Sequence, residues 1–371
     1  MIEQSFMKAL FHGVIAEEMV FPYPQMPAED RENTSMILDS VRRFFAANVD
    51  SAKIDREHTI PQAVLDGAKS LGLYGLQIPT EYDGIGLSST AYARVMQEVG
   101  ALDPSVAVTL GAHQSIGLKA ILLFGTLDQK RRYLPKLATG EWTAAFALTE
   151  PGAGSDLTAL KTTAVRSGNE FIVNGEKLFI TNVVPGRTIG LVCLIEGKPA
   201  VLTVELPQEE NEHFQLRKYG LWALKHTYNQ GIIFRDFRVP AENLLTLPRG
   251  DGLTIAYHGL NLGRIALCAG AAGTMRLMMA SMIPWANFRL TYGQTIAKRE
   301  LVRRRLGQLA GLITACDGLV AWCAGLIDHG VHGDDEMPSV VVFHKAQAEL
   351  SPLRMVGMSE GAGNRNDSGK V

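Results

Sequence analysis

The feature that most constrains this chain is an apolar run that ends in a threonine and leads at once into a glycine turn. It occupies residues 146–156 and reads Phe-Ala-Leu-Thr-Glu-Pro-Gly-Ala-Gly-Ser-Asp. A short apolar segment bounded by Pro and Gly is typical of a strand that runs into a tight loop. Glycines let backbone N–H groups approach a ligand closely, and the hydroxyls of Thr149 and Ser155 can donate or accept hydrogen bonds. The segment matches neither GxGxxG nor a GKS/GKT phosphate loop, so an ordinary strand and turn remains the alternative.

A second segment, residues 174–182, favours a binding role for the first. It reads Asn-Gly-Glu-Lys-Leu-Phe-Ile-Thr-Asn. Asn-Gly flanked by alternating apolar residues predicts a hairpin turn, so we expect both segments in one small antiparallel sheet. Phe179 and Thr181 are two residues apart on one predicted strand and therefore face the same side. Together they can supply an aromatic wall and a hydroxyl.

The pattern of apolar residues along the sequence changes twice, which predicts three domains in an α+β, mainly α, fold. Residues 1–142 carry the apolar spacing of helices and form the expected N-terminal helical domain. Residues 143–248 carry short β-branched and aromatic runs with no helical pattern between them, which predicts a small β-barrel and argues against a Rossmann sheet. Residues 249–371 are helical again and form the expected C-terminal helical bundle.

Start signals and apolar spacing locate several helices within these domains. Pro61 and Ser88 mark two helix starts, and residues 106–123 form an apolar run that predicts one buried helix. His113 lies inside that run, where a lone histidine is more often a core residue with its hydrogen bonds satisfied than a ligand. Further helices are expected at residues 34–45, 252–282 and 298–325.

Composition excludes several functional classes. The formal net charge of -2 gives no general electrostatic case for binding nucleic acid. No run of eighteen apolar residues is evident, so we expect no transmembrane segment. The four cysteines form no CxxC pair, and the N-terminus lacks the layout of a signal peptide. These features favour a cytoplasmic protein, or one of the mitochondrial matrix if the source is eukaryotic, and we expect no metal site.

Residues 146–156 and 171–182 closely resemble the flavin-binding β-domain of the acyl-CoA dehydrogenases. The resemblance covers roughly residues 5 to 300 and looks most like the very-long-chain branch of that family. It fades beyond about residue 310, where the chain looks truncated or divergent and ends short of the family's usual last helices. Blocks that carry the resemblance outside the β-domain are residues 49–55, 71–77, 112–117, 124–126, 133–138, 238–245 and 289–294.

The resemblance implies an FAD site. It implies that Thr149 reaches the flavin near N5 and that Phe179 backs the ring where the family usually has Trp. Thr181 is expected on the ribityl-phosphate side. The remaining cofactor contacts implied around the first segment are Phe146, Leu148, Gly154 and Ser155, and Ser155 also looks like a contact to the acyl-CoA.

The resemblance also implies contacts beyond the β-domain. Arg289 and Thr291 occupy the place where the family contacts the FAD pyrophosphate of a neighbouring subunit, so a homodimer or homotetramer is expected. Asn261 and Arg264 occupy positions that the family uses near the CoA adenine and beside the catalytic carboxylate, respectively. A buried Arg on so apolar a helix would need a partner.

The catalytic base is where the sequence departs from the family. Removing the α-proton of an acyl-CoA requires a desolvated carboxylate with a raised pKa. One subgroup carries this Glu at a position that is Gly263 here, and the others carry it near the C-terminus, where Glu360 fits locally. Counting without gaps from Arg264 instead places residues 356–363 on an earlier family segment and the catalytic position beyond Val371. The count without gaps is favoured and leaves the base unassigned, and Glu360 is the candidate if the local fit holds instead.

The resemblance implies an FAD-dependent acyl-CoA dehydrogenase of fatty acid β-oxidation. Its substrate would be a fatty acyl-CoA and its electron acceptor an electron-transfer flavoprotein. Two alternatives follow from the uncertain base. One is a catalytically degenerate family member that acts as an assembly or interaction scaffold. The other is a flavin oxidase or monooxygenase on the same fold.

Overall fold

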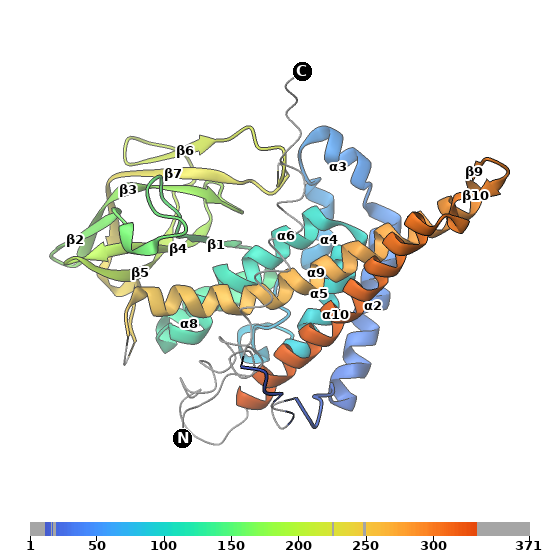
Figure 1. Cartoon of the computed structure of the whole chain (residues 1–371). Coiled ribbons are helices and arrows are strands. Elements are labelled where there is room, and N and C mark those ends of the chain that lie inside the picture. The colour runs from blue at the N-terminus through green and yellow to red at the C-terminus, as the bar shows by residue number, and fades with distance from the viewer. Residues whose placement is uncertain (1–11, 16, 18–19, 225, 248–249, 332–371) are drawn as a thin grey trace. The chain divides into compact units, whose positions relative to one another are not determined.

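The computed structural model describes residues 12–331 except 16, 18–19, 225 and 248–249 (Figure 1). Its residues group into two compact units. The first comprises Met1–Arg42, Ser88–Pro104 and Arg264–Val371, and the second comprises Arg43–Leu87 and Ser105–Gly263. The three-domain boundaries expected from the sequence stay a prediction.

Helices lie on both sides of the β-rich region in sequence, as expected. Those of the first unit include α5 (Ser89–Leu102) and α10 (Glu300–Val331). Three helices have residues in both units: α2 (Ala28–Asn48), α6 (Pro104–Gly111) and α9 (Gly252–Phe288). Those of the second unit include α3 (Ser51–Glu57), α4 (Gln62–Ser70), η2 (Thr80–Tyr82), η3 (Ala112–Gly117), α7 (Lys119–Phe124), α8 (Leu127–Thr139), η4 (Leu157–Ala159) and η5 (Ala241–Asn243).

The single helix expected over residues 106–123 is wrong in detail, because a π-helical turn, η3, separates α6 from α7. The wider turn places Gly117 against β1, where an added Cβ would lie 2.7 Å from Ala144. It also directs the side chains of His113 and Gln114 toward carbonyls of residues 73 and 74. Long-range hydrogen bonds therefore determine the interruption, and apolar spacing does not reveal it.

The β-rich region forms one eight-stranded sheet with the order β6-β7-β3-β2-β4-β5-β8, and β1 pairs with β4 in parallel (Figure 1). Its core is a cluster of buried side chains that includes Phe171, Phe214 and Phe234. The strands are β1 (Ala144–Ala147), β2 (Thr163–Ser167), β3 (Glu170–Ile180), β4 (Thr188–Ile195), β5 (Lys198–Glu205), β6 (Phe214–Lys218), β7 (Gln230–Pro240) and β8 (Leu244–Leu245).

The hairpin predicted at Asn174-Gly175 is wrong. Both residues lie within β3, where the pairing with β7 shifts register between Val173 and Gly175. Gly175 has φ 154°, and a Cβ there would lie 2.4 Å from the hydroxyl of Thr162. The glycine therefore permits a β-bulge and a close approach instead of a turn.

In the first unit, α5 packs closely on α9 through glycines. A Cβ at Gly100 would lie 3.0 Å from the Cα of Gly270, and one at Gly273 would lie 2.1 Å from the carbonyl oxygen of Gln97. The carboxylate of Asp328 on α10 caps α5, accepting hydrogen bonds from the backbone of Ser89 (2.6 Å) and Thr90 (3.0 Å). The C-terminal end of α9 is joined to the start of α10 through β9 (Leu290–Thr291), β10 (Gln294–Thr295) and η6 (Ile296–Lys298) (Figure 1).

Three helical stretches are long and apolar enough to cross a membrane, judged by length and composition alone. They are Pro104–Phe124, Gly252–Phe288 and Glu300–His329, with mean hydropathies of 1.4, 1.4 and 1.7. The absence of a transmembrane segment therefore stays a prediction.

Candidate functional site

The ends of β1 and β3 carry the candidate site, and the structure places them side by side within the second unit. The backbone N–H of Leu178 donates to the carbonyl of Thr149 at 2.8 Å. The ammonium of Lys177 donates to the carbonyl of Leu148 at 3.0 Å. The two segments identified in the sequence thus meet, although through loop-to-strand contacts and not through the predicted hairpin.

Residues 150–155, called the glycine loop below, form a turn that is closed by backbone hydrogen bonds and exposed on one side. Glu150 and Ala153 exchange backbone hydrogen bonds of 2.8 and 3.2 Å, which closes the turn. Gly154 and Ser155 are exposed, and a Cβ at Gly152 would meet nothing within 4 Å. This side of the loop therefore leaves room for a ligand to approach the backbone.

The side chains of Phe146 and Leu148 face inward, into a buried cluster with Leu157 and Val192. They can therefore offer a ligand only their backbone groups. Thr149 is partly buried. Its hydroxyl is the first side-chain polar group beyond the end of β1.

Phe179 presents a partly open aromatic ring in an unfavourable backbone conformation. Its side chain is 52% exposed and its φ is 57°, a region that costs a bulky residue of order 1–3 kcal/mol. The pairing of β3 with β7 shifts register between Lys177 and Ile180, which accommodates this conformation. The ring of Tyr219 packs on Phe179 with 5.1 Å between centroids. An exposed aromatic held in a strained backbone is a feature of functional sites.

Asn229 fixes Thr181 beside Phe179. Its side-chain amide donates to the carbonyl of Phe179 (3.2 Å) and to the hydroxyl of Thr181 (3.1 Å). Sequence analysis missed Asn229 and Tyr219, and neither has a motif signal. The structure shows that Gly231 makes room for Tyr219, because a Cβ at residue 231 would lie 2.3 Å from the hydroxyl of Tyr219.

A buried ion pair lies directly behind the two strand ends, and sequence analysis also missed it. Lys177 is 0% exposed and Glu150 is 3% exposed, and their charged atoms are 2.7 Å apart. Burial lowers the pKa of Lys177, and the hydrogen bond to Glu150 opposes that effect. Burial acts to raise the pKa of Glu150, but hydrogen bonds from Lys177 and its other donors hold that pKa below its usual value. Each partner therefore opposes the effect of burial on the pKa of the other.

His113 is a core residue with its hydrogen bonds satisfied, as predicted. Its Nε2 lies 3.1 Å from the carbonyls of Tyr74 and Leu137, and its Nδ1 accepts the N–H of Ala144 at 2.9 Å. Burial lowers the pKa of His113 to about 4. The neutral ring ties η3 to the start of β1.

The N-terminal part of α9 packs on η3 through glycines. A Cβ at Gly263 would lie 3.2 Å from the hydroxyl oxygen of Ser115, and one at Gly259 would lie 3.7 Å from Ile116. Contacts this close at residue 263 leave little room for a larger side chain. Asn261 is fully buried on the same helix.

The other predicted site residues lie elsewhere. Arg264 is partly buried on α9 in the first unit, and Arg289 is exposed just beyond the end of α9. Thr291 lies on β9, where its carbonyl and hydroxyl accept hydrogen bonds from Arg299 at 2.6 and 3.1 Å. Glu360 lies outside the described residues.

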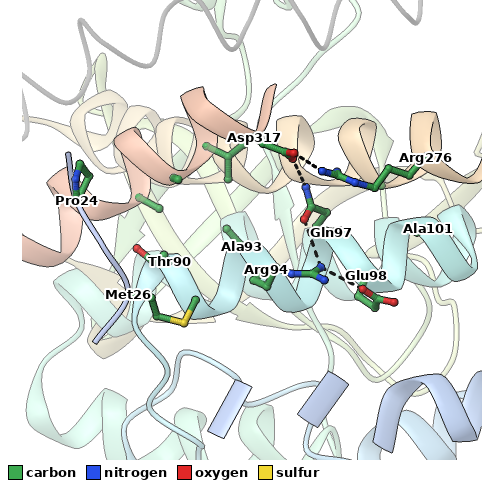
Figure 2. Close-up of a pocket in the computed structure, with 14 residues that line it drawn as sticks. Pro24, Met26, Thr90, Ala93, Arg94, Gln97, Glu98, Ala101, Arg276 and Asp317 are labelled. Atoms are coloured by element: carbon green, nitrogen blue, oxygen red, sulfur yellow. Dashed lines mark hydrogen bonds and ion pairs between the residues drawn. The ribbon is translucent and has the colours of Figure 1, made fainter. Parts of the chain in front are cut away.

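The first unit contains a separate cavity of about 450 Å³ between α5, α9 and α10 (Figure 2). Figure 2 shows Arg276 and Gln97 converging on Asp317, while Arg94 pairs with Glu98 at 3.1 Å. The pair of Arg276 and Asp317 joins α9 to α10, whereas Arg94 and Glu98 pair within α5, one turn apart. Among the described residues, no group of three or more His, Cys, Asp or Glu side chains could hold a metal ion.

Along the chain, a set of helices is followed by an eight-stranded sheet and then by two long helices. The strand ends of the sheet present an exposed aromatic ring and hydroxyls. This arrangement is the acyl-CoA dehydrogenase fold. The chain belongs to the acyl-CoA dehydrogenase family. The family's N-terminal, middle and C-terminal domains match residues 31–141, 145–235 and 250–348, respectively. The resemblance found in the sequence is thus confirmed, as is the fold class.

Relatives include the very long-chain specific acyl-CoA dehydrogenases of Macaca fascicularis and Homo sapiens. Each is 36% identical over 341 residues, which is 88% of this chain and 52% of the relative. The chain therefore spans about half the length of these relatives.

Two solved structures share the fold with a TM-score of 0.76. One is described as the electron transferring flavoprotein of Acidaminococcus fermentans; it is 28% identical, and the match covers 91% of this chain and 87% of that one. The other is an acyl-CoA dehydrogenase complexed with FAD from Bacillus anthracis; it is 30% identical, and the match covers 90% of this chain and 58% of that one.

Proposed function

We propose that this protein binds FAD and dehydrogenates a fatty acyl-CoA between its α and β carbons. The observation that carries the proposal is the paired strand ends of β1 and β3. They present the half-exposed ring of Phe179 with the hydroxyls of Thr149 and Thr181 on neighbouring segments. The related acyl-CoA dehydrogenase of Bacillus anthracis was solved with FAD, which supports the choice of cofactor.

The residues present fit a flavin. An isoalloxazine is a flat apolar plate with a polar edge, so its site needs an aromatic or aliphatic wall and nearby hydrogen-bonding groups. Phe179 supplies an exposed ring, and Asn229 holds the hydroxyl of Thr181 at a fixed position beside it. The exposed backbone of Gly154 and Ser155 suits the approach of a bulky polar ligand. When bound, FAD would supply the hydride acceptor.

The base that removes the α-proton is proposed to be Glu360. Position 263, which carries the base in one subgroup of the family, is a glycine in close contact with Ser115. Arg264, next along α9, is retained at the position that supports the carboxylate in the family. The general-base role requires a carboxylate within hydrogen-bond reach of the α-carbon proton.

Further parts of the proposal concern assembly and electron transfer. Arg289 and Thr291 would contact the FAD pyrophosphate of a second copy, which makes the active protein a homodimer or homotetramer. An electron-transfer flavoprotein is the proposed acceptor. We propose a cytoplasmic location, or the mitochondrial matrix if the source is eukaryotic.

An anaerobic titration tests the proposal. The purified protein is expected to be yellow, and a long-chain acyl-CoA is expected to bleach its flavin absorbance. Bound flavin that resists bleaching would favour a scaffold. In a parallel aerobic assay with the same acyl-CoA, little oxygen uptake is expected, and rapid oxygen consumption would favour an oxidase. A colourless protein whose melting temperature does not rise with added FAD would refute the proposal. Saturation to about a hundred times Kd should stabilise the fold by roughly 2.7 kcal/mol.

The base is tested separately. Glu360→Gln is expected to retain bound FAD and lose bleaching. Bleaching at the normal rate would remove Glu360 from the mechanism while leaving the dehydrogenase assignment intact.

A further inference from the structure

We propose that the buried pair of Glu150 and Lys177 is a positioning element that fixes the orientation of the flavin-facing strand ends. The proposal rests on the proposed function, because it assigns these residues a role toward the same cofactor. Neither side chain would touch the flavin, since both are buried behind the strand ends.

The pair joins four segments of the chain at one point. The ammonium of Lys177 donates to the carboxylate of Glu150 at 2.7 Å and to the carbonyl of Leu148 at 3.0 Å. The two carboxylate oxygens also accept the backbone N–H groups of Lys161 (2.6 Å) and Thr162 (3.1 Å). The end of β1, the glycine loop, the approach to β2 and strand β3 are therefore held together by two side chains.

The hydrogen bonds fall on the peptide groups that flank the site. Lys177 holds the carbonyl of Leu148, and the N–H of Leu178 holds the carbonyl of Thr149. Two successive carbonyls at the end of β1 are thus fixed, and with them the direction in which Thr149 presents its hydroxyl. On β3, Lys177 lies two residues before Phe179, immediately ahead of the register shift that gives Phe179 its positive φ.

Stability alone is a poor explanation for such a pair. Burying two charges costs several kcal/mol per ion, and apolar residues of similar volume often replace a buried ion pair with no loss of stability. Apolar side chains pack without preferred direction, whereas an ammonium and a carboxylate specify the direction of each peptide group they bind. What the pair adds over an apolar core is the orientation of the segments that carry Thr149 and Phe179.

A charge-neutral double variant separates orientation from stability. Glu150→Gln with Lys177→Met removes both charges and keeps the volume close to the original. The matched control is Glu176→Gln, which breaks the ion pair between Glu176 on β3 and Arg217 on β6, two strands of the same sheet that flank β7. Glu176 is adjacent to Lys177 on β3, but its pair is partly exposed.

Three measurements on the full chain give the result. In the double variant, FAD is expected to bind at least tenfold more weakly than in the wild type at a temperature well below unfolding. The visible absorption band of the bound flavin is expected to change shape, and the Leu178 amide is expected to exchange with solvent at least tenfold faster in the FAD-free protein. The control is expected to match the wild type in all three measurements.

The outcomes distinguish this proposal from the proposed function. A double variant that binds FAD within twofold of the wild type, with Leu178 exchange unchanged, would overturn the positioning role. If the wild type itself binds no FAD, the proposed function fails, while amide exchange still reports whether the pair orients the strand ends. Should the double variant not fold, Glu150→Asp is measured in its place, because it keeps both charges but shortens the carboxylate side chain by one methylene; the same direction is expected in each readout.

Discussion

Acid pH is expected to destabilise this protein through His113, whose neutral form is built into the core. Nδ1 accepts the N–H of Ala144, and Nε2 lies against two carbonyls, so the neutral ring with its proton on Nε2 satisfies every partner. A second proton on Nδ1 would face the Ala144 N–H, donor against donor. Burial accordingly lowers the pKa of His113 to about 4 from an ordinary value of 6.5.

The sign and size of the effect follow from linkage. Above pH 6.5 the histidine is neutral in both states and contributes no pH dependence. As the pH falls from 6.5 to about 4, the unfolded chain takes up a proton that the folded chain refuses, so folding becomes less favourable. The full difference corresponds to roughly 3 kcal/mol, reached near the lower pKa.

Urea unfolding from pH 7.5 to 4 measures this loss. We compare the wild type with His113→Gln, and with His12→Gln as an exposed-histidine control. At pH 7.5, His113→Gln should be less stable by about 1–3 kcal/mol, because a buried backbone group loses its partner. Toward pH 4 the two curves should converge by roughly 3 kcal/mol, since the variant lacks the titrating ring. Curves that stay parallel over this range would refute the reasoning.

Three further changes probe other parts of the fold. Asp328→Asn should lower the free energy of unfolding, measured by denaturant titration, by about 2 kcal/mol, because the N-terminus of α5 loses a charged acceptor. The control Asp128→Asn, on an exposed face, should change it by under about 0.5 kcal/mol. Gly175→Ala should cost more than about 2 kcal/mol by the same measurement, since its Cβ would overlap Thr162, and a smaller loss would contradict the bulge geometry. Phe179→Gly should relieve about 1 kcal/mol of backbone strain yet weaken FAD binding about tenfold in a fluorescence titration, and unchanged binding would remove Phe179 from the site.

Signals within a few residues of one another were enough to predict much of the fold. Ser88 was expected at a helix start, and its hydroxyl accepts the N–H of Ala91 at the N-terminus of α5. The strand and loop at residues 146–156 were likewise predicted from an apolar run and its glycines. In each case the physical cause lies within the segment, in an unpaired N–H or a backbone angle that only certain residues adopt.

Features that depend on distant partners were missed or misread. Asn174-Gly175 has the signature of a turn, but Thr162 and β7 determine that the glycine serves a bulge. Lys177 reads as an ordinary polar residue on an alternating strand, and its burial becomes visible only when Glu150 lies against it. A local sequence pattern is compatible with several backbone conformations, and contacts with distant segments determine which of them forms.

The family's alternative base position is Gly263 here, and it packs against η3. A Cβ at Gly263 would already lie 3.2 Å from the hydroxyl of Ser115 and 3.4 Å from Ile116, so a glutamate at this position would crowd these two side chains. We propose that the base comes from another segment, for which Glu360 is the candidate within this sequence. A Gly263→Glu change combined with Glu360→Gln is expected to lose stability without regaining flavin bleaching. Recovery of bleaching in that double variant would show that residue 263 does have room for a base, and would return the catalytic position to α9.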